Sequence, residues 1–580
     1  MRTCATRTLG TIAVTLACAL PALASDVIPS KGKIATDIVP GIGQSDFSPY
    51  AGRDFPTQVL WGDTHLHTAV SVDAGTMNTV GQEDAFRFAR GEEITTTHGL
   101  RAKLSRPLDF LVLTDHAEMY GLMPQLLAGD PAIVGTEQGA KWYGELQSGD
   151  RDRIFNTAME IVASLQKEQP PFDSANLTRK AWAAYTELAD KYNDPGIFSA
   201  VIGYEWTAIG GFNLHRNVVF RGDGAEACKT EPFSQFDSQN PEDLWRALDG
   251  FSKETGAQVL AIPHNGNLSN GRMFSVKNFD GTPLNKELAE LRARMEPIIE
   301  ATQIKGDGEA HPFLSPDDEF ADYETWDIAN LDGTEAKQDS MLQYEYAREA
   351  LKTGLKLKES LGVNPYRFGM IGSTDSHTSM ATAEEENFFG KHSGVEPEPQ
   401  RWEHTVITSQ LDPDQAIIGW QQAASGYAAV WATENTREAI FDAMKRKETY
   451  ATTGPRMLVR FFGGWDFTEA DAQSRLPANA GYMKGVPMGG DLPPAPAGTS
   501  PTFLAAALKD PYSGNLDRLQ VVKVWLDSSG ERQEKVYDVA WSGGREPGSD
   551  GKLPPVGNTV DLANATWTNT IGAPELITVW

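Results

Sequence analysis

The sequence contains very little cysteine, with 3 among 580 residues. Two of these, Cys4 and Cys18, lie in a segment that we expect to be removed, so that Cys228 remains alone. A single cysteine excludes an intramolecular disulfide, a cysteine-based metal site and redox chemistry by a cysteine pair. The chemistry of the protein must therefore use histidines, carboxylates and hydroxyl groups.

Positive charge is also scarce, and the chain has no long apolar run. The sequence has 51 Lys plus Arg against 79 Asp plus Glu, which gives a formal net charge of −28. This balance argues against nucleic acid as a partner, because binding its backbone requires an excess of Lys and Arg. A small anionic substrate would need a local positive site, such as metal ions. We predict no transmembrane segment. The sequence does not indicate an oligomeric state.

The first residues have the pattern of an export signal. Arg2 and Arg7 precede the apolar residues 9–20, and small residues follow at 22–24, as a cleavage site requires. We therefore predict a signal peptide over residues 1–24 and an exported, periplasmic protein, with secretion as an alternative. A lipoprotein acylated at Cys18 is less favoured, because residues 15–18 match that cleavage pattern poorly.

The rest of the chain changes character twice. Residues 25–56 form a leading segment rich in Gly, Pro and Ser, and residues 456–580 alternate polar and apolar residues between turns, which predicts a β-rich C-terminal domain. Over residues 57–455, short apolar runs alternate with helical patterns, which is typical of an α/β fold with a mostly parallel sheet. Seven runs favour a distorted (β/α)7 barrel with large insertions, one of them a loop or cap at 381–425. The runs are 59–61, 110–113, 200–202, 218–220, 259–262, 298–299 and 368–371.

Histidines and acids lie where these predicted strands end. The carboxyl ends of barrel strands meet at one face, where active sites form. The side chains placed there are His65, His67, His116, Glu205, His264, Asp375 and His377. His215 instead precedes its run, which predicts that this strand runs in the opposite direction.

These residue types point to a metal centre. Alternation along an extended strand places His65 with His67, and Asp375 with His377, on one side of their strands. Imidazoles suit Zn, Mn or Fe, and carboxylates can bridge two ions. Six histidines with at least two acids exceed the needs of one four-coordinate ion, so we expect two or three divalent metal ions. Each motif alone is weak, and the prediction depends on their combination.

Taken in order, these motifs resemble the PHP (polymerase and histidinol phosphatase) superfamily of metal-dependent phosphoesterases, and more narrowly its exported branch, domain of unknown function 3604. The resemblance covers about residue 50 to the C-terminus. Its most specific segments are 61–68, 108–118, 203–207, 215–220, 303–312, 372–377 and 450–456. It implies a distorted seven-stranded barrel with a trinuclear site.

The resemblance also implies the ligands of each ion. The first ion would be held by His65, His67, Glu205 and Asp375. Glu205 would bridge to a second ion, completed by His215 and His264, and the third would be held by His116 and His377. Where many PHP proteins have a further histidine, this chain has Asp73, which shifts the preference toward harder ions such as Mn or Mg.

The expected reaction is hydrolysis by a metal-bound hydroxide. Lys305 would fix a phosphate or sulfate charge, and His311 would protonate the leaving oxygen. Asp115, beside His116, would either orient an imidazole or cap the turn after its strand. Candidate anchors for the anionic substrate are Arg216, Arg272 and Asn267, for which a salt bridge or a surface loop is the alternative role.

We therefore predict an exported metal-dependent hydrolase, with phosphoesterase activity favoured. Two alternatives stay open. One is an amidohydrolase-like or sulfate-ester hydrolase acting on a periplasmic metabolite or glycan fragment. The other is a non-catalytic, metal-containing binding protein whose residues 456–580 recognise a partner or glycan. The fold does not decide among them.

Overall fold

The structure is a computed structural model. It describes residues 55–580 except 166, 168, 209–211, 332, 385–386, 394–396, 398–399, 409–415, 423–424 and 475. The predicted signal peptide over residues 1–24 lies outside the described residues, as does nearly all of segment 25–56. Pro56–Trp580 forms one compact unit. Among the helices described, none combines the length and apolar character needed to cross a membrane.

All seven apolar runs are strands, as predicted. They are β1 (Gln58–Leu66), β4 (Phe110–Leu113), β5 (Ser199–Trp206), β6 (Arg216–Phe220), β7 (Val259–Pro263), β8 (Ile298–Gln303) and β10 (Gly369–Gly372). Five of them join β13 (Tyr427–Ala432) and β14 (Thr449–Thr452) in a sheet of order β14-β13-β1-β4-β5-β6-β7. The others, with β9 (Gly306–Asp307), form a second sheet of order β10-β8-β9. That sheet contacts both edges of the first, β8 beside β7 and β10 beside β14.

The strand directions make this a mixed α/β fold with a curled sheet. β1, β4 and β5 are parallel, as are β8 and β10. β6 runs antiparallel to both β5 and β7, as the position of His215 predicted, and β13 runs antiparallel to both β1 and β14. The expected (β/α)7 repeat is thus interrupted by the reversed β6 and by β13, whose antiparallel pairing with β1 and β14 was not predicted. Only residues 207–215 join β5 to β6, which is shorter than the crossover of about a dozen residues that a parallel pair needs.

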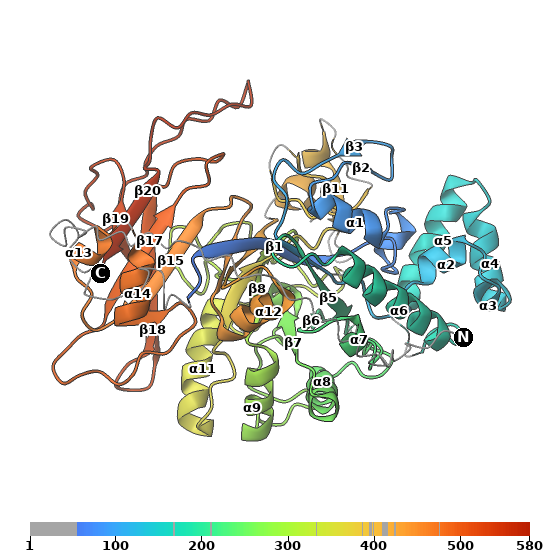
Figure 1. Ribbon diagram of the computed structural model, residues 1–580, viewed down its shortest axis with the longest axis horizontal. Helices are drawn as coiled ribbons and strands as arrows, with labels where there is room; N and C mark the ends of the chain where they lie inside the picture. Colours follow the sequence, from blue (N-terminus) through green and yellow to red (C-terminus); the bar gives the residue numbers. More distant parts are fainter. Residues whose placement is uncertain are drawn as a thin grey trace, which may run out of the picture. The chain divides into compact units, whose positions relative to one another are not determined.

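Helices cover the outside of the strands (Figure 1). α6 (Ala175–Tyr192) contacts β5, α8 (Pro241–Thr255) and α9 (Lys286–Met295) contact β7, and α12 (Arg437–Arg446) contacts β13. α4 (Glu137–Leu146) ends before a separate helix, α5 (Arg151–Ser164), begins, because Asp150 caps a new N-terminus there. The remaining elements before β13 are α1 (Gln82–Ala89), β2 (Ile94–Thr95), β3 (Arg101–Ala102), α2 (Leu122–Leu127), α3 (Pro131–Val134), α7 (Gly224–Ala227), α10 (Asp339–Leu342), α11 (Ala347–Leu361), β11 (Thr405–Thr408) and β12 (Ala416–Ile418).

One apolar cluster draws a buried side chain from almost every strand, and it explains how the site is positioned. Its members include Leu60, Val112, Val201, Val219, Ile262, Ile298, Ile371 and Val430. Because side chains alternate along a strand, residues two or four positions away share the face of these members. Glu205 follows Val201 by four residues, and His264 follows Ile262 by two. The inner face of the strands thus changes from apolar groups to metal-binding groups toward one end.

The region after residue 455 is rich in strands. β15 (Leu458–Gly464), β16 (Gly485–Pro487), β17 (Thr502–Leu508) and β20 (Glu575–Val579) form an antiparallel sheet, and β18 (Arg518–Leu526) pairs with β19 (Arg532–Trp541). Two short helices, α13 (Glu469–Ala472) and α14 (Pro477–Lys484), complete it. The β18–β19 hairpin contacts α11, where Arg348 pairs with Glu534 at 3.2 Å. The region belongs to the same compact unit as the strands before it, so a separate domain stays a prediction.

Candidate metal centre

The nine predicted metal ligands lie in one cluster. Each of them contacts at least one other member. Its members are His65, His67, Asp73, His116, Glu205, His215, His264, Asp375 and His377. Several groups of three among these side chains place one ligand atom each within 4.8 Å of the others. Except for Asp73, which precedes a short 3-10 helix, the members lie at or near the ends of strands of the two sheets, so the arrangement of the strands assembles most of the cluster.

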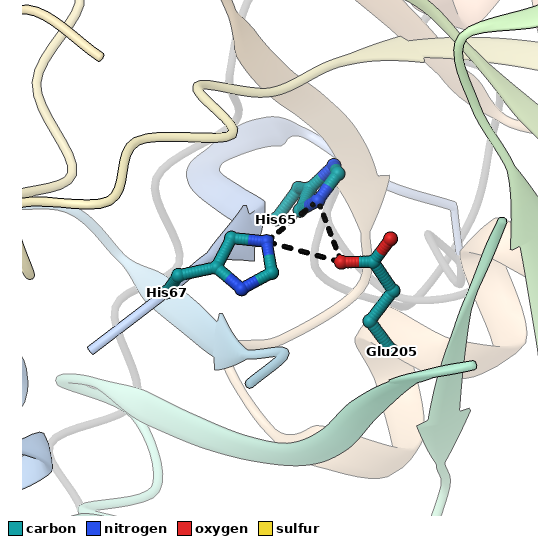
Figure 2. Close-up of side chains that lie close together, drawn as sticks. All are labelled: His65, His67 and Glu205. Atoms are coloured by element: carbon teal, nitrogen blue, oxygen red, sulfur yellow. Dashed lines mark hydrogen bonds and ion pairs between the residues drawn. The ribbon is translucent and has the colours of Figure 1, made fainter. Parts of the chain in front are cut away.

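Glu205 stands at the centre and faces two sets of imidazoles. Its Oε2 lies 3.0 Å from His67 Nε2 and 3.4 Å from His65 Nε2, toward which both rings point (Figure 2). Its Oε1 lies 2.7 Å from His215 Nδ1 and 2.9 Å from His264 Nε2. A carboxylate with each oxygen turned to a different pair of nitrogens has the arrangement that can bridge two ions.

The carboxylate of Asp73 lies beside His116 and His377, the two histidines expected to hold the third ion. Its Oδ2 is 3.3 Å from His116 Nε2 and 3.5 Å from His377 Nδ1. Its other oxygen accepts a hydrogen bond of 2.6 Å from Ala74 N at the start of a short 3-10 helix (Ala74–Thr76). This backbone contact holds the carboxylate in place and leaves Oδ2 facing the imidazoles.

Burial and mutual charge shift the pKa values strongly in this cluster. Burial raises the pKa of Glu205, yet the rings of His116 and His264 bring it well below its usual range. Burial lowers the pKa of His65, but Asp375 and other nearby carboxylates raise it to about 10. The carboxylates thus draw positive charge into the cluster, and divalent ions would compete with protons for the same nitrogens.

In three of the histidines, Nδ1 contacts a side chain outside the cluster, and this contact orients the imidazole. His65 Nδ1 lies 3.0 Å from Glu300 Oε2, His67 Nδ1 lies 3.0 Å from Ser71 Oγ, and His116 Nδ1 lies 2.6 Å from Thr207 Oγ1. Such partners fix the ring orientation of metal-ligating histidines. Our sequence interpretation missed all three, although alternation places Glu300 on the face of Ile298 and could have identified it.

The donor set fits divalent metal ions. It consists of buried imidazole nitrogens and carboxylate oxygens, the ligands of Zn, Mn and Fe. His65 Nε2 and His67 Nε2 face each other at 3.2 Å, and Glu205 Oε2 is buried without a hydrogen-bond partner among the described residues. Buried polar atoms of this kind normally have a partner, and a cation would supply one here.

Two lysines flank Asp375 at the edge of the cluster. The Nζ atom of Lys391 lies 2.6 Å from Asp375 Oδ1 and 3.0 Å from His377 Nε2, and Lys305 contacts Asp375 Oδ2. Burial lowers the pKa of Lys391 to about 7, although Asp375 opposes the shift. Lys305 was predicted, whereas Lys391 comes from the 381–425 segment, where no sequence pattern marked it.

Asp115 holds a turn and does not orient an imidazole. It accepts hydrogen bonds of 2.6 Å from Thr68 N, 2.9 Å from Thr68 Oγ1 and 2.7 Å from Gln82 Nε2. Of the two expected roles, these contacts match the capping of the turn, and the predicted catalytic role stays a prediction. The turn it holds comes directly after His67, so Asp115 supports the shape of the site from outside.

The two predicted arginine anchors lie away from the cluster. Arg216 is buried and pairs with Glu296 at 2.9 Å, because alternation turns it to the face opposite His215. The guanidinium of Arg272 lies 4.1 Å from the ring centroid of Phe212. Neither arginine lines the cavity above the cluster, so neither is placed to hold a substrate there.

Asn267 and His311 also bind other groups of the protein. The amide of Asn267 donates hydrogen bonds of 3.1 Å to the carbonyls of Lys305 and Trp326. His311 pairs with Asp327 at 2.8 Å and does not line the cavity. Loop contacts, which periodicity does not encode, decide both positions. The expected roles in substrate binding and proton donation are not supported.

Most of the cluster lines one cavity of about 280 Å³. The polar groups that reach it include His67, Asp73, His116, Glu205, His215, Lys305, Asp375, His377 and Lys391. Both the expected metal positions and the lysine pair are therefore open to a small molecule. The cavity is slightly smaller than the usual range of small-molecule sites, which is roughly 300–1,000 Å³.

Comparison with known proteins places the chain in a family. Curated proteins give no match. A solved structure from Bacteroides vulgatus, described as a two-domain protein containing a predicted PHP-like metal-dependent phosphoesterase, is 13% identical in sequence. The alignment covers 90% of this chain and 95% of that chain, but its TM-score of 0.29 is too low to support an inference. A family model described as "Protein of unknown function (DUF3604)" matches residues 54–580. The chain therefore belongs to the DUF3604 family, as the order of its motifs predicted.

Proposed function

We propose that the protein is a metal-dependent hydrolase and that the bond it cleaves is a phosphoester, as its resemblance to the PHP superfamily implies. The observation that supports this best is the position of Glu205. One of its oxygens faces His65 and His67, and the other faces His215 and His264. Such an arrangement at the wall of a cavity suits two ions that act on one substrate.

The residues divide into three ligand groups in this proposal. His65, His67, Glu205 and Asp375 would hold one ion, Glu205 with His215 and His264 a second, and Asp73 with His116 and His377 a third. Ions bound there supply activation of water and neutralisation of the anionic group under attack. Glu300, Ser71 and Thr207 keep the imidazoles in the orientation that binding requires.

The lysine pair favours a phosphoester over an amide or a sulfate ester. Lys305 and Lys391 both contact Asp375, so their positive charge exceeds what that carboxylate neutralises whenever Lys391, whose pKa burial lowers to about 7, is protonated. A charge-assisted hydrogen bond to a phosphate oxygen is stronger than one to a neutral carbonyl. A phosphomonoester carries more negative charge than a sulfate ester and gains correspondingly more from this site.

Metal content and a substrate panel test the proposal together. We expect two or three equivalents of Zn, Mn or Fe per chain by plasma mass spectrometry on protein purified without chelators. Glu205→Gln should lose at least one equivalent and nearly all hydrolysis of phosphoesters, while the exposed control Glu290→Gln should keep both. Full metal content and turnover in Glu205→Gln would refute the role of this carboxylate. Turnover of sulfate, amide or lactone substrates in place of phosphoesters would refute the bond assignment.

Export belongs to the same proposal. The pattern of residues 1–24 supports it, and periplasmic fractionation of the expressed chain, with sequencing of its N-terminus, tests it. Recovery of the uncleaved chain from the cytoplasm would contradict it.

A further inference from the structure

The cavity beside the metal cluster has apolar walls. The side chains that form them are Val162, Leu165, Phe212, Trp326, Leu331 and Val406. None of them comes from the strands that supply the metal ligands: α5 and its end, the segment after β5, the segment after β9 and the short β11 contribute them. The metal-binding groups therefore occupy one side of the cavity, and inserted segments shape the rest.

Five polar side chains accompany the apolar ones in this wall, and two of them are engaged. Asn330 holds its own turn through Thr334 N and Glu335 N, at 2.9 and 3.0 Å, and Thr207 is 2.6 Å from the ring of His116. The further polar side chains of the described lining, apart from the metal-binding groups and the lysines, are Asn213, His392 and Gln422. Asn213 Oδ1 and His392 Nδ1 are buried without a hydrogen-bond partner among the described residues, so a ligand with many hydroxyl groups would find a few polar partners beside the apolar side chains of this wall.

The apolar wall is fixed in place by contacts behind it. Trp326 is 3% exposed and belongs to a cluster with Leu268 and Ile417. Its carbonyl accepts a hydrogen bond from Asn267, which also holds the carbonyl of Lys305. The Asn267 amide thus links Trp326 of the apolar wall to Lys305 beside the metal cluster. A ligand with an anionic group and an apolar group would therefore meet two preorganised surfaces.

These surfaces discriminate among phosphoesters. A sugar or nucleotide phosphate would bring hydroxyl or base groups against the apolar wall, where polar groups left without a partner weaken binding. An apolar group would instead bind more tightly in proportion to the apolar area that the wall removes from water. The cavity of about 280 Å³ is nearly twice the roughly 150 Å³ that binds one benzene ring, which leaves room for a phosphate as well.

We propose that the substrate is a phosphoester of an apolar alcohol or phenol. Its phosphate lies at the metal cluster with Lys305 and Lys391, and its apolar group lies against Phe212, Trp326 and Leu331. This inference rests on the proposed function, because it assigns the substrate class of the same site. It makes Phe212 and Leu331 specificity residues with no part in the chemistry.

Binding of two phosphonates to the metal-loaded protein tests the inference without relying on turnover. Benzylphosphonate and 2-hydroxyethylphosphonate share one head group and differ in the group that reaches the wall. We expect benzylphosphonate to bind about tenfold more tightly by calorimetry. Phe212→Ala should reduce that preference about fivefold or more and leave 2-hydroxyethylphosphonate unchanged. The matched control is Phe313→Ala, whose side chain is 57% exposed outside the cavity; it should change neither affinity.

The outcomes separate this inference from the function on which it rests. If both phosphonates bind equally, or if Phe212→Ala weakens both to the same degree, the apolar substrate class is refuted while the metal-dependent hydrolase stands. If neither binds to metal-loaded protein, the anion site itself is wrong and both proposals fall. A Leu331→Asn variant repeats the measurement on a second wall residue, should Phe212→Ala fail to fold.

Discussion

Glu300 provides the sharpest test of how the metal cluster is supported. Its Oε2 lies 3.0 Å from His65 Nδ1, and both side chains are buried with no exposed surface. Glu300→Gln keeps the size of the side chain but removes the charge that, with Asp375, raises the pKa of His65. Loss of such an outer partner typically weakens metal binding 10–100-fold, which corresponds to about 1.4–2.7 kcal/mol. We therefore expect a loss of this size in a chelator-competition titration.

The matched control is another buried glutamate near the same strand. Glu296 pairs with Arg216 at 2.9 Å and Arg292 at 2.8 Å and has no contact with the cluster. Glu296→Gln should lower the free energy of unfolding but leave metal affinity per folded molecule unchanged. Equal metal affinity in Glu300→Gln and the wild type would refute the claim that Glu300 orients His65. Equal losses in both variants would show a general effect of stability.

Three further predictions concern the turn after β1, the close packing at Gly62 and the pH dependence of metal binding. Asp115→Ala should lower the free energy of unfolding by about 2–4 kcal/mol, because it leaves buried donors of the turn after β1 unpaired, and thermal unfolding measures it. Gly62→Ala should cost about 1–3 kcal/mol, since its new Cβ would lie 2.5 Å from ring atoms of Phe110; Gly81→Ala, with open space around it, should cost much less. Metal content after dialysis should fall from pH 8 to pH 5, because protons compete for the imidazoles and carboxylates raise the pKa of metal-free His65 to about 10. Constant metal content across this range would contradict the imidazole ligands.

Periodicity explains why so much of the site could be predicted from the sequence. In strands such as β5 and β7, the buried apolar face continues into a predicted ligand, Glu205 or His264, so a strand end predicts a ligand position. The reversed position of His215 even predicted the direction of β6. The same alternation shows that Arg216, one residue further on, faces away. Its prediction as an anchor took adjacency along the chain for adjacency in space, whereas its side chain pairs with Glu296 away from the cavity.

The remaining errors involve segments where periodicity carries no information. Lys391 reaches Asp375 from an inserted segment, and its position depends on how that segment folds over the strands. Asn267 and His311 lie in loops whose courses are set by hydrogen bonds to other loops. The strands β13 and β14 were missed because they close the sheet through antiparallel pairing, which an alternation of strands and helices does not predict.

The chemistry and the specificity of the site come from different parts of the chain, because strands supply most of the metal ligands and inserted segments supply the cavity wall. The metal-binding groups sit at strand ends, where ladder hydrogen bonds and a buried apolar cluster restrain them. Trp326 and Leu331 come from insertions that contribute no metal ligand. Changes in these segments can alter which leaving group fits without moving Glu205 or its imidazoles. A chimaera that replaced a wall segment should therefore change the relative affinity for phosphonates while metal content stays constant. If metal content fell with the exchange, the walls and the metal centre would be one structural unit, and the separation argued from their origins would be wrong.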